Sequence, residues 1–316
     1  MAKPVVFMFP GQGAQYYQMA RELYDTHPRF KLWMQHCNEI VSPLIETSLI
    51  DKIYQGKKSD DFDRILYSNP ALVSVELSLA KVVMEIGVQP DFLVGYSLGE
   101  FTAAIISGAM SIEQGLELVV DYAKILEEKS PHGGMLAIIA QEGVISEYSD
   151  IFNGCTLASR NFQNNFVVSG LLENILKTQD NLVEIGIPCQ KLPVNYAFHS
   201  EIMDPLEQDF KRVTKQHNFT NLRTPTISAL KTNQITDVNT DHFWELIRHP
   251  IEFDSTIRKM ANKEDYLFID VGPSGALATA VKYLLPETTQ SKPIELINQF
   301  GNDLRTIERF KSVALQ

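Results

Sequence analysis

The amino-acid sequence predicts an α/β fold built around a parallel sheet. Short apolar runs that end in turn residues alternate with helical patterns along the 316 residues. The run Val5–Phe9 ends at Pro10-Gly11, and helical patterns occupy 69–86 and 112–128. Strands that alternate with helices pair in parallel, and the helices cover both faces of the sheet. Hydrophobic residues make up 44% of the chain, which is enough to form a large core.

The remaining elements follow in a regular order. A second apolar run at 92–94 ends at Gly95, and Ser111 with Gln114 forms a capping box that begins the helix 112–128. The middle third of the chain has short strand patterns around a polar helical pattern, and we expect a compact β/α subdomain inserted into the larger body there. The other expected elements are strands at 135–140 and 165–169, a helix at 172–185, and strands at 189–194, 226–230 and 267–271.

The charge and the cysteine pattern exclude several classes of protein. Lys and Arg number 28 against 39 Asp and Glu, a net charge of −11, so nucleic-acid binding is not expected. No apolar run approaches the ~18 residues of a membrane span, and the N-terminus is interpreted as a buried strand rather than a signal peptide. The three cysteines, Cys37, Cys155 and Cys189, have neither zinc nor disulfide spacing. We therefore expect a cytoplasmic protein that binds no metal.

The motif Gly95-Tyr96-Ser97-Leu98-Gly99 carries the clearest chemical signal. It is a G-x-S-x-G sequence that follows a predicted strand and precedes a predicted helix, which is the context of a nucleophile elbow. The sharp turn would raise the Ser97 hydroxyl above the sheet edge, beside a helix N-terminus that favours an oxyanion. The backbone N–H of Leu98 would be one oxyanion donor. The alternative is a glycine-rich turn with an incidental serine.

A serine nucleophile needs a base, and His199 is the best candidate. The chain has seven histidines, but most lie in polar segments where a surface position is expected. His199 closes the apolar stretch 192–198, where a side chain can project from a sheet end into a cleft. A second glycine turn at 9–15 offers backbone amides for an anion. It lacks the lysine of a phosphate-binding loop, which argues against nucleotide binding.

These motifs together resemble one family. Phe-Pro-Gly-Gln-Gly at 9–13, Gly-x-Ser-Leu-Gly-Glu at 95–100 and Ala-Phe-His at 197–199 look like the acyl-carrier-protein acyltransferases of fatty-acid and polyketide synthesis. Supporting landmarks in the family's order are Asn69-Pro70-Ala71, Gly134-Met135-Leu136-Ala137, Asn161, Val167-Val168-Ser169-Gly170 and Val271-Gly272-Pro273. They span nearly the whole chain, which is similar in length to the trans-acting acyltransferases that serve modular polyketide synthases.

The resemblance implies a role for each site residue. Ser97 would attack an acyl thioester and form an acyl-enzyme, and His199 would act as general base in both half-reactions. The backbone N–H groups of Gln12 and Leu98 would form the oxyanion hole. Asn161 matches an asparagine of the family's active-site loop, where it would support the structure rather than react.

The resemblance also implies a division of the chain. Residues 1–128 and 197–316 would form a large α/β-hydrolase-like domain, and 129–196 would form a small ferredoxin-like subdomain, with the cleft between them. The family holds its histidine by a main-chain carbonyl instead of a third acid. The helix 244–249, which precedes a proline, would supply that carbonyl to His199.

The partner implied by the resemblance is an acyl carrier protein of a polyketide synthase. It would bring its own phosphopantetheine arm, so no resident cofactor is expected, and we expect the enzyme to be a monomer. Because carrier proteins are acidic and this chain is too, recognition would need a local basic patch. Lys57, Lys58, Arg160 and Lys191 are candidates, and the alternative for each is an ordinary solvated surface position.

The sequence departs from malonyl-transferring members at two positions. Tyr96 stands where the family usually has histidine, and a gap-free count from the elbow puts Tyr122 where malonyl enzymes carry an arginine for the substrate carboxylate. Lys124 is two positions away, ~200° around a helix, and should point elsewhere. Burying a carboxylate without its partner costs ~3–5 kcal/mol. Phe198 would narrow the chamber beside His199, as in members that use unbranched acyl groups.

These departures favour small, uncharged acyl groups. They resemble the acyl hydrolases of trans-acyltransferase polyketide systems, which release acyl groups from carrier proteins with water as the second acceptor. The main alternative is a trans-acting acyltransferase that loads malonyl or another acyl group from CoA. A catalytically idle docking subunit and a lipase-like esterase are further alternatives, and the missing triad acid argues against the esterase.

Overall fold

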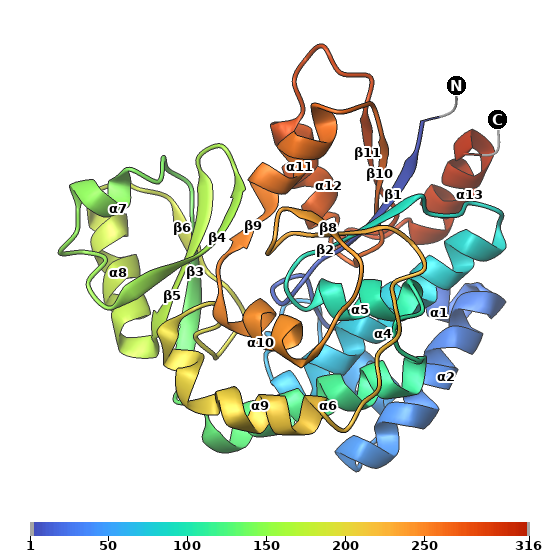
Figure 1. Ribbon diagram of the computed structural model, residues 1–316, viewed down its shortest axis with the longest axis horizontal. Coiled ribbons are helices and arrows are strands. Elements are labelled where there is room, and N and C mark those ends of the chain that lie inside the picture. The colour runs from blue at the N-terminus through green and yellow to red at the C-terminus, as the bar shows by residue number, and fades with distance from the viewer. Residues whose placement is uncertain (1–2, 315–316) are drawn as a thin grey trace.

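The computed structural model describes residues 3–314 and contains two sheets (Figure 1). The larger sheet has six strands in the order β11-β10-β1-β2-β7-β8. Its strands are β1 Val5–Phe9, β2 Phe92–Gly95, β7 Thr226–Ser228, β8 Asn233–Ile235, β10 Leu267–Asp270 and β11 Lys292–Glu295. All of them run parallel except β8, which pairs antiparallel with β7. The predicted parallel α/β fold is confirmed.

Helices cover both faces of the larger sheet, as the unbroken apolar run of β1 requires. Phe7 and Phe9 face a core that includes residues of the helices α2, α4, α5 and α6, whereas Val6 and Met8 face a core with α11 and α12. The helices of the large body are α1 Arg21–Thr26, α2 Pro28–Ile45, α3 Leu49–Gln55, α4 Ile65–Glu85, α5 Gly99–Ile106, α6 Ile112–Lys129, α9 Glu207–Thr214, α10 Thr240–Arg248, α11 Phe253–Ala261, α12 Ala276–Leu284 and α13 Asp303–Ala314. A 3-10 helix at Glu201–Leu206 precedes α9.

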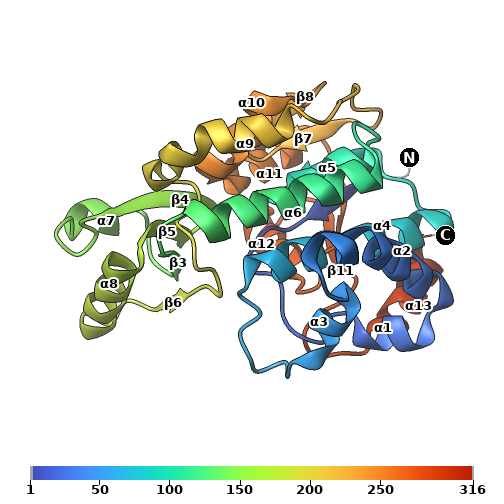
Figure 2. The ribbon, with the colours of Figure 1, turned by 90° about the horizontal axis from the view of Figure 1, so that it is seen from below.

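The capping box predicted at the start of α6 is present. The Ser111 side chain accepts from the backbone of Gln114, and the Gln114 side chain accepts from the backbone of Ser111. From there α6 runs along the molecule toward the smaller sheet (Figure 2). No helix among the described residues is long and apolar enough to span a bilayer.

The smaller sheet has the order β6-β3-β5-β4-β9. Its elements are β3 Gly133–Ile138, α7 Val144–Glu147, β4 Cys155–Phe162, β5 Asn165–Leu171, α8 Leu172–Glu184, β6 Cys189–Lys191 and β9 Ile251–Glu252. The first six follow the β-α-β-β-α-β order of a ferredoxin-like unit, with antiparallel pairing throughout. Leu136 and Val168 pack on Ile175 and Leu182 of α8. The predicted small subdomain is therefore present.

Several details of the smaller sheet differ from the sequence-based expectation. The first strand lies at Gly133–Ile138 and not at 135–140, and no strand was expected at β4. The strand expected at 189–194 ends at Lys191, and Pro193, which has no backbone N–H, cannot extend the ladder. The last strand, β9, comes from residues 251–252, far outside 129–196, and pairs parallel with β4. A strand of two residues is too short to show the alternation of polar and apolar side chains by which strands are predicted. The domain boundaries at 128/129 and 196/197 stay a prediction.

Glu76 is a buried acid in the core between α4 and α5. Its side chain accepts a hydrogen bond from Thr102, and its other carboxyl oxygen has no partner among the described residues. Burial raises the pKa of Glu76 well above its usual value, and the nearby carboxyl of Asp270 raises it further. The folded chain therefore keeps this proton at a pH where the unfolded chain releases it. Stability contributed by this group falls as the pH rises above the unfolded pKa of about 4.3.

We predict that Glu76→Gln stabilises the protein at pH 8 by ~1 kcal/mol or more, because the amide keeps the shape without an ionisable proton. The gain should shrink toward pH 4, where the unfolded carboxyl is also protonated. Urea unfolding at both pH values measures this, with the exposed Glu128→Gln as the control. A variant that is less stable than the wild type at pH 8 would contradict the prediction.

Candidate active site

Ser97 lies in a sharp turn between β2 and α5, and its backbone is left-handed with φ 51°. The flanking glycines, Gly95 and Gly99, are required because other backbone atoms lie where a side chain would begin. A Cβ on Gly95 would lie 2.4 Å from the Glu100 Cα, and one on Gly99 would lie 1.9 Å from the Phe9 carbonyl oxygen. The elbow thus packs directly against its own helix and against β1. Side chains at either position would force it apart.

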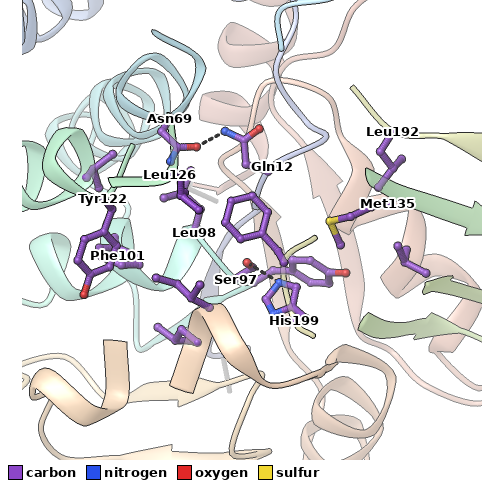
Figure 3. Close-up of a pocket in the computed structure, with 16 residues that line it drawn as sticks. Gln12, Asn69, Ser97, Leu98, Phe101, Tyr122, Leu126, Met135, Leu192 and His199 are labelled. Carbon is purple, nitrogen blue, oxygen red and sulfur yellow. Dashed lines mark hydrogen bonds between the residues drawn. The ribbon is translucent and has the colours of Figure 1, made fainter. Parts of the chain in front are cut away.

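His199 is buried beside Ser97, as Figure 3 shows. The Ser97 Oγ lies 2.9 Å from its Nε2, and the His249 carbonyl oxygen lies 2.8 Å from its Nδ1. A carbonyl only accepts, so Nδ1 carries the proton and Nε2 accepts from the serine hydroxyl. The backbone N–H of His199 donates to the Ile247 carbonyl at 2.7 Å. Both acceptors come from the end of α10, within or beside the segment expected from the sequence.

The environment keeps His199 neutral. Burial lowers its pKa to about 4, although the hydrogen bond to the His249 carbonyl opposes this shift. At neutral pH the Nε2 lone pair is therefore available to take a proton. When it does so, the carbonyl on Nδ1 and the partial negative charge at the C-terminus of α10 stabilise the cation.

The loop after β1 lies against the elbow. A Cβ on Gly11 would meet the Tyr96 carbonyl at 2.8 Å and the Ser97 Cβ at 3.1 Å, so only glycine allows this approach. The Gln12 side chain is tied away from Ser97, because its amide donates to Ser68 and Asn69. Both predicted oxyanion donors, the backbone of Gln12 and of Leu98, thus come from segments that touch the nucleophile. Their role stays a prediction.

Asn69 is a contact that the sequence did not assign. It was recognised only as a landmark beside Pro70. In the structure it lies on α4, lines the pocket and accepts a hydrogen bond from the Gln12 side chain (Figure 3). The sequence signal that could have found it is a polar residue within an otherwise apolar helical stretch.

Asn161 and Tyr96 join the two subdomains. The Tyr96 hydroxyl donates to the Asn161 side-chain carbonyl at 2.8 Å, and the Asn161 amide donates to Asn165 at 2.8 Å. Ser159 donates to the same Asn161 oxygen at 3.2 Å. These hydrogen bonds hold Asn161 between the subdomains and engage the Tyr96 hydroxyl, and the supporting role of Asn161 stays a prediction.

A pocket extends from Ser97 into the large body. It holds about 670 Å³ of empty space, including its open mouth. Its lining residues come from both subdomains and are mostly apolar: Gln12, Asn69, Tyr96, Ser97, Leu98, Phe101, Val119, Tyr122, Leu126, Met135, Val167, Leu192, Phe198, His199, Leu246 and Ile247. None of these side chains, all from the described part of the chain, is a lysine or arginine. Lys124 is exposed instead, as predicted.

The Tyr122 hydroxyl is engaged within the large body. It donates to Thr214 of α9, whose own hydroxyl donates to the Phe210 carbonyl at 2.7 Å. In Figure 3 the oxygen of Tyr122 lies on the side away from Ser97. Tyr122 therefore presents only its ring to the pocket, as Phe198 does beside His199.

A second, open groove lies between the subdomains beside the pocket. It shares Gln12, Tyr96, Val167 and Leu192 with the pocket. Its other lining residues are Pro10, Gly11, Gly13, Ala14, Ala137, Asn161, Phe162, Asn165, Phe253, Ala276, Leu277 and Ala280. No charged side chain from residues 3–314 lines it. The groove and the pocket adjoin at the four residues that they share.

The expected basic patch is only partly available. Arg160 pairs with Glu142 at 2.5 Å and with Glu252, so its charge is neutralised within the chain. Lys58 donates to the Gln299 carbonyl at 3.0 Å. Lys57 is exposed, and Lys191 is partly exposed. The pairing of Arg160 was not predictable because its partners are distant in sequence.

Comparison with known proteins identifies the family. Residues 6–316 match the acyl transferase domain, and the chain belongs to this family. The resemblance inferred from the motifs is confirmed.

Two bacterial relatives match over almost the full chain. The polyketide biosynthesis acyltransferase homolog PksD of Bacillus subtilis is 37% identical, covering 99% of this chain and 98% of the relative. The homolog BaeD of Bacillus velezensis is 35% identical, covering 100% and 98%. Among solved structures, the acyltransferase domain from the second module of the salinomycin polyketide synthase has a TM-score of 0.85 at 26% identity, covering 98% of this chain and 72% of that one. The loading acyltransferase of the avermectin synthase has a TM-score of 0.90 at 21% identity, covering 99% and 100%, and shares the fold.

The low pKa of His199 predicts an unusual pH profile. The base works only when unprotonated, so the reaction of Ser97 with an acyl thioester should stay constant from pH 7 to about pH 5.5. It should then fall with a midpoint near 4, whereas an ordinary histidine would give a midpoint near ~6.5. The measurement is kcat/KM between pH 3.5 and 7, with circular dichroism at each pH to verify folding. A midpoint near 6.5 in folded protein would contradict the prediction.

Proposed function

We propose that this chain is an acyl hydrolase that releases small or stalled, uncharged acyl groups from the carrier proteins of a polyketide synthase. One observation carries the proposal: the acyl pocket beside Ser97 contains no cationic side chain to pair with a substrate carboxylate. The names of PksD and BaeD support the polyketide setting. The Ser97–His199 contact supports an acyl-serine intermediate.

In the first half-reaction, Ser97 Oγ attacks the thioester carbonyl while Nε2 of His199 takes the hydroxyl proton. The carbonyl oxygen becomes an oxyanion that the backbone N–H groups of Gln12 and Leu98 stabilise. The C–S bond then breaks, and the proton on His199 goes to the departing thiolate. The products are an acyl ester on Ser97 and a free carrier thiol.

In the second half-reaction, water replaces the thiol. His199 takes a proton from the water as its oxygen attacks the ester carbonyl, and the same oxyanion donors serve again. When the C–O bond to Ser97 breaks, His199 returns the proton to Oγ. A carboxylic acid leaves, and the free enzyme is restored.

The pocket explains the preference for uncharged groups. A malonyl group would bury its carboxylate without a charge partner, at a cost of ~3–5 kcal/mol, or a factor of ~10²–10³ in rate. The Tyr96 hydroxyl already donates to Asn161, and the Tyr122 hydroxyl donates to Thr214. Neither can meet the carboxylate without breaking an existing bond. An acetyl or similar group carries no such penalty.

The carrier protein would deliver its phosphopantetheine arm along the groove between the subdomains, whose uncharged lining suits that arm. Lys57 and Lys191 remain candidates for contact with an acidic carrier protein. Arg160 is a poor candidate because two carboxylates already surround it.

The second candidate function is transfer, and the family supports it. The groove that admits one carrier arm would admit a second, whose thiol would replace water in the last step. A trans-acting acyltransferase for malonyl or another acyl group would use the same Ser97 and His199.

Ser97→Ala tests the covalent intermediate. Brief exposure of the wild type to an acetyl-loaded carrier protein should add one acetyl mass, and the variant should gain none because it has no nucleophile. Intact-mass spectrometry makes the measurement. Ser107→Ala, a buried serine elsewhere in the same body, is the control and should acylate normally. An undiminished adduct on Ser97→Ala would refute the intermediate.

Tyr122 tests the selectivity. We predict that the wild type hydrolyses acetyl-loaded carrier protein with a kcat/KM ~10²-fold or more above that for the malonyl-loaded form. Tyr122→Arg should raise malonyl acylation relative to acetyl, because it introduces the missing cation. Tyr122→Phe should leave the ratio unchanged, since the hydroxyl faces Thr214. A wild-type preference for malonyl, with transfer faster than hydrolysis, would favour the second candidate function instead.

A further inference from the structure

We propose that Glu100 and His242 are positioning residues that set the distance between Ser97 and His199. They form a buried hydrogen-bonded link between α5, which begins two residues after Ser97, and α10, whose C-terminal end supplies the carbonyl acceptors for His199. This inference rests on the proposed Ser97–His199 chemistry. It adds two residues that do not themselves line the pocket.

The link is well defined. The His242 Nε2 lies 2.9 Å from Glu100 Oε2, and Ser228 of β7 donates to Glu100 Oε1 at 2.8 Å. Glu100 is 2% exposed, His242 is 7% exposed and Ser228 is fully buried. Both oxygens of the carboxylate are thus satisfied by side chains from two other elements. A buried carboxylate is costly unless it is bonded in this way.

One end of the link lies beside the nucleophile. Glu100 is in the first turn of α5, and the N–H of its backbone donates to the Ser97 carbonyl at 3.0 Å. Gly99 and Gly95 hold this turn against β1 and β2 without room for a side chain. A shift of Glu100 would therefore shift Ser97.

The other end lies one helix away from the base. His242 is in the first turns of α10, whose Asn239 cap accepts from its backbone N–H at 2.9 Å. The same helix ends at the Ile247 and His249 carbonyls that hold His199. Because a short helix moves as a rigid unit, a shift of His242 is transmitted to these carbonyls.

The contacts form a closed ring. It runs from Ser97 through Glu100 and His242, along α10 to the His249 carbonyl, and through His199 back to Ser97 Oγ. The neighbouring rings of Phe101 and Phe243 also pack α5 on α10, with centroids 4.6 Å apart. Apolar contacts allow sliding, whereas a hydrogen bond fixes direction and length. The polar link therefore supplies the register that the aromatic contact lacks.

A matched pair of amides tests the link. The amide nitrogen of His242→Gln can occupy the position of Nε2 and still donate to Glu100, whereas the side chain of His242→Asn is too short to reach it. The probe is a fluorophosphonate, which reacts with an activated serine whatever the second acceptor is. We expect His242→Asn to label at Ser97 ~10-fold or more slowly than the wild type, and His242→Gln within ~3-fold of it, since small misplacements of reacting groups lower rates steeply.

Further readouts separate positioning from folding. Steady-state hydrolysis of acetyl-loaded carrier protein by His242→Asn should show a lower kcat with KM within ~2-fold of the wild type. Thr178→Val removes a buried hydrogen bond in the small subdomain, where Thr178 donates to Ile151 at 2.8 Å, and serves as the control for lost stability. Thr178→Val should be labelled at the wild-type rate even if its melting temperature falls as much as that of His242→Asn.

The outcomes are distinct. Wild-type labelling rates in folded His242→Asn, or equally slow labelling in His242→Gln, would overturn the inference. If His242→Asn does not fold, Glu100→Gln replaces it, because an amide cannot accept from both Ser228 and His242 through two oxygens. It should label at least ~3-fold more slowly, and a wild-type rate would overturn the inference too. A wild type that is not labelled at Ser97 would instead refute the proposed function.

Discussion

The hydrogen bond from His199 to the His249 carbonyl is the constraint on which the site depends. It selects the imidazole tautomer whose free nitrogen faces Ser97. A neutral carbonyl takes the place that a carboxylate holds in many serine hydrolases. Without that negative charge, burial dominates and keeps the pKa of His199 low. The His199 imidazole is therefore uncharged at neutral pH.

The His249 carbonyl belongs to a segment that contacts both His199 and the small subdomain. The helix α10 ends at Arg248, and β9 begins at Ile251 and pairs with β4 of the small subdomain. A few residues thus hold the base on one side and anchor the second half of the cleft on the other. The geometry of the site and the seating of the small subdomain are linked through the main chain rather than through side chains alone.

The parts of the site that depend on contacts between residues close in sequence could be predicted from the sequence. The elbow was predictable because Gly95 and Gly99 are needed by backbone contacts that any strand-turn-helix of this kind makes. The ferredoxin-like unit followed from the family resemblance, because the local patterns indicated three of its strands and its long helix but neither β4 nor α7. The pairing of His199 with Ser97 followed from family motifs rather than from periodicity.

What could not be predicted depends on contacts between distant segments. The direction of the Tyr122 hydroxyl is set by Thr214, which lies on another helix. The charge of Arg160 is neutralised by Glu142 and Glu252, which no local pattern associates with it. The strand β9 is too short to have a sequence pattern of its own, and it forms because its backbone pairs with β4 at the edge of the smaller sheet.

The end of β4 has a consequence for how such enzymes can diversify. Within four consecutive positions, Ser159 pairs with Ile251, Arg160 binds Glu252, Asn161 accepts from Tyr96, and Phe162 stacks on Tyr283 of α12 with ring centroids 4.8 Å apart. These contacts fasten the small subdomain to the large one beside the groove that Asn161 and Phe162 line. Phe162 lines that groove but not the pocket at Ser97, so replacing Phe162 would change the groove and leave Ser97, His199 and the carbonyl acceptors of His199 in place. Access to the site can thus be altered by mutation independently of the reaction that takes place there.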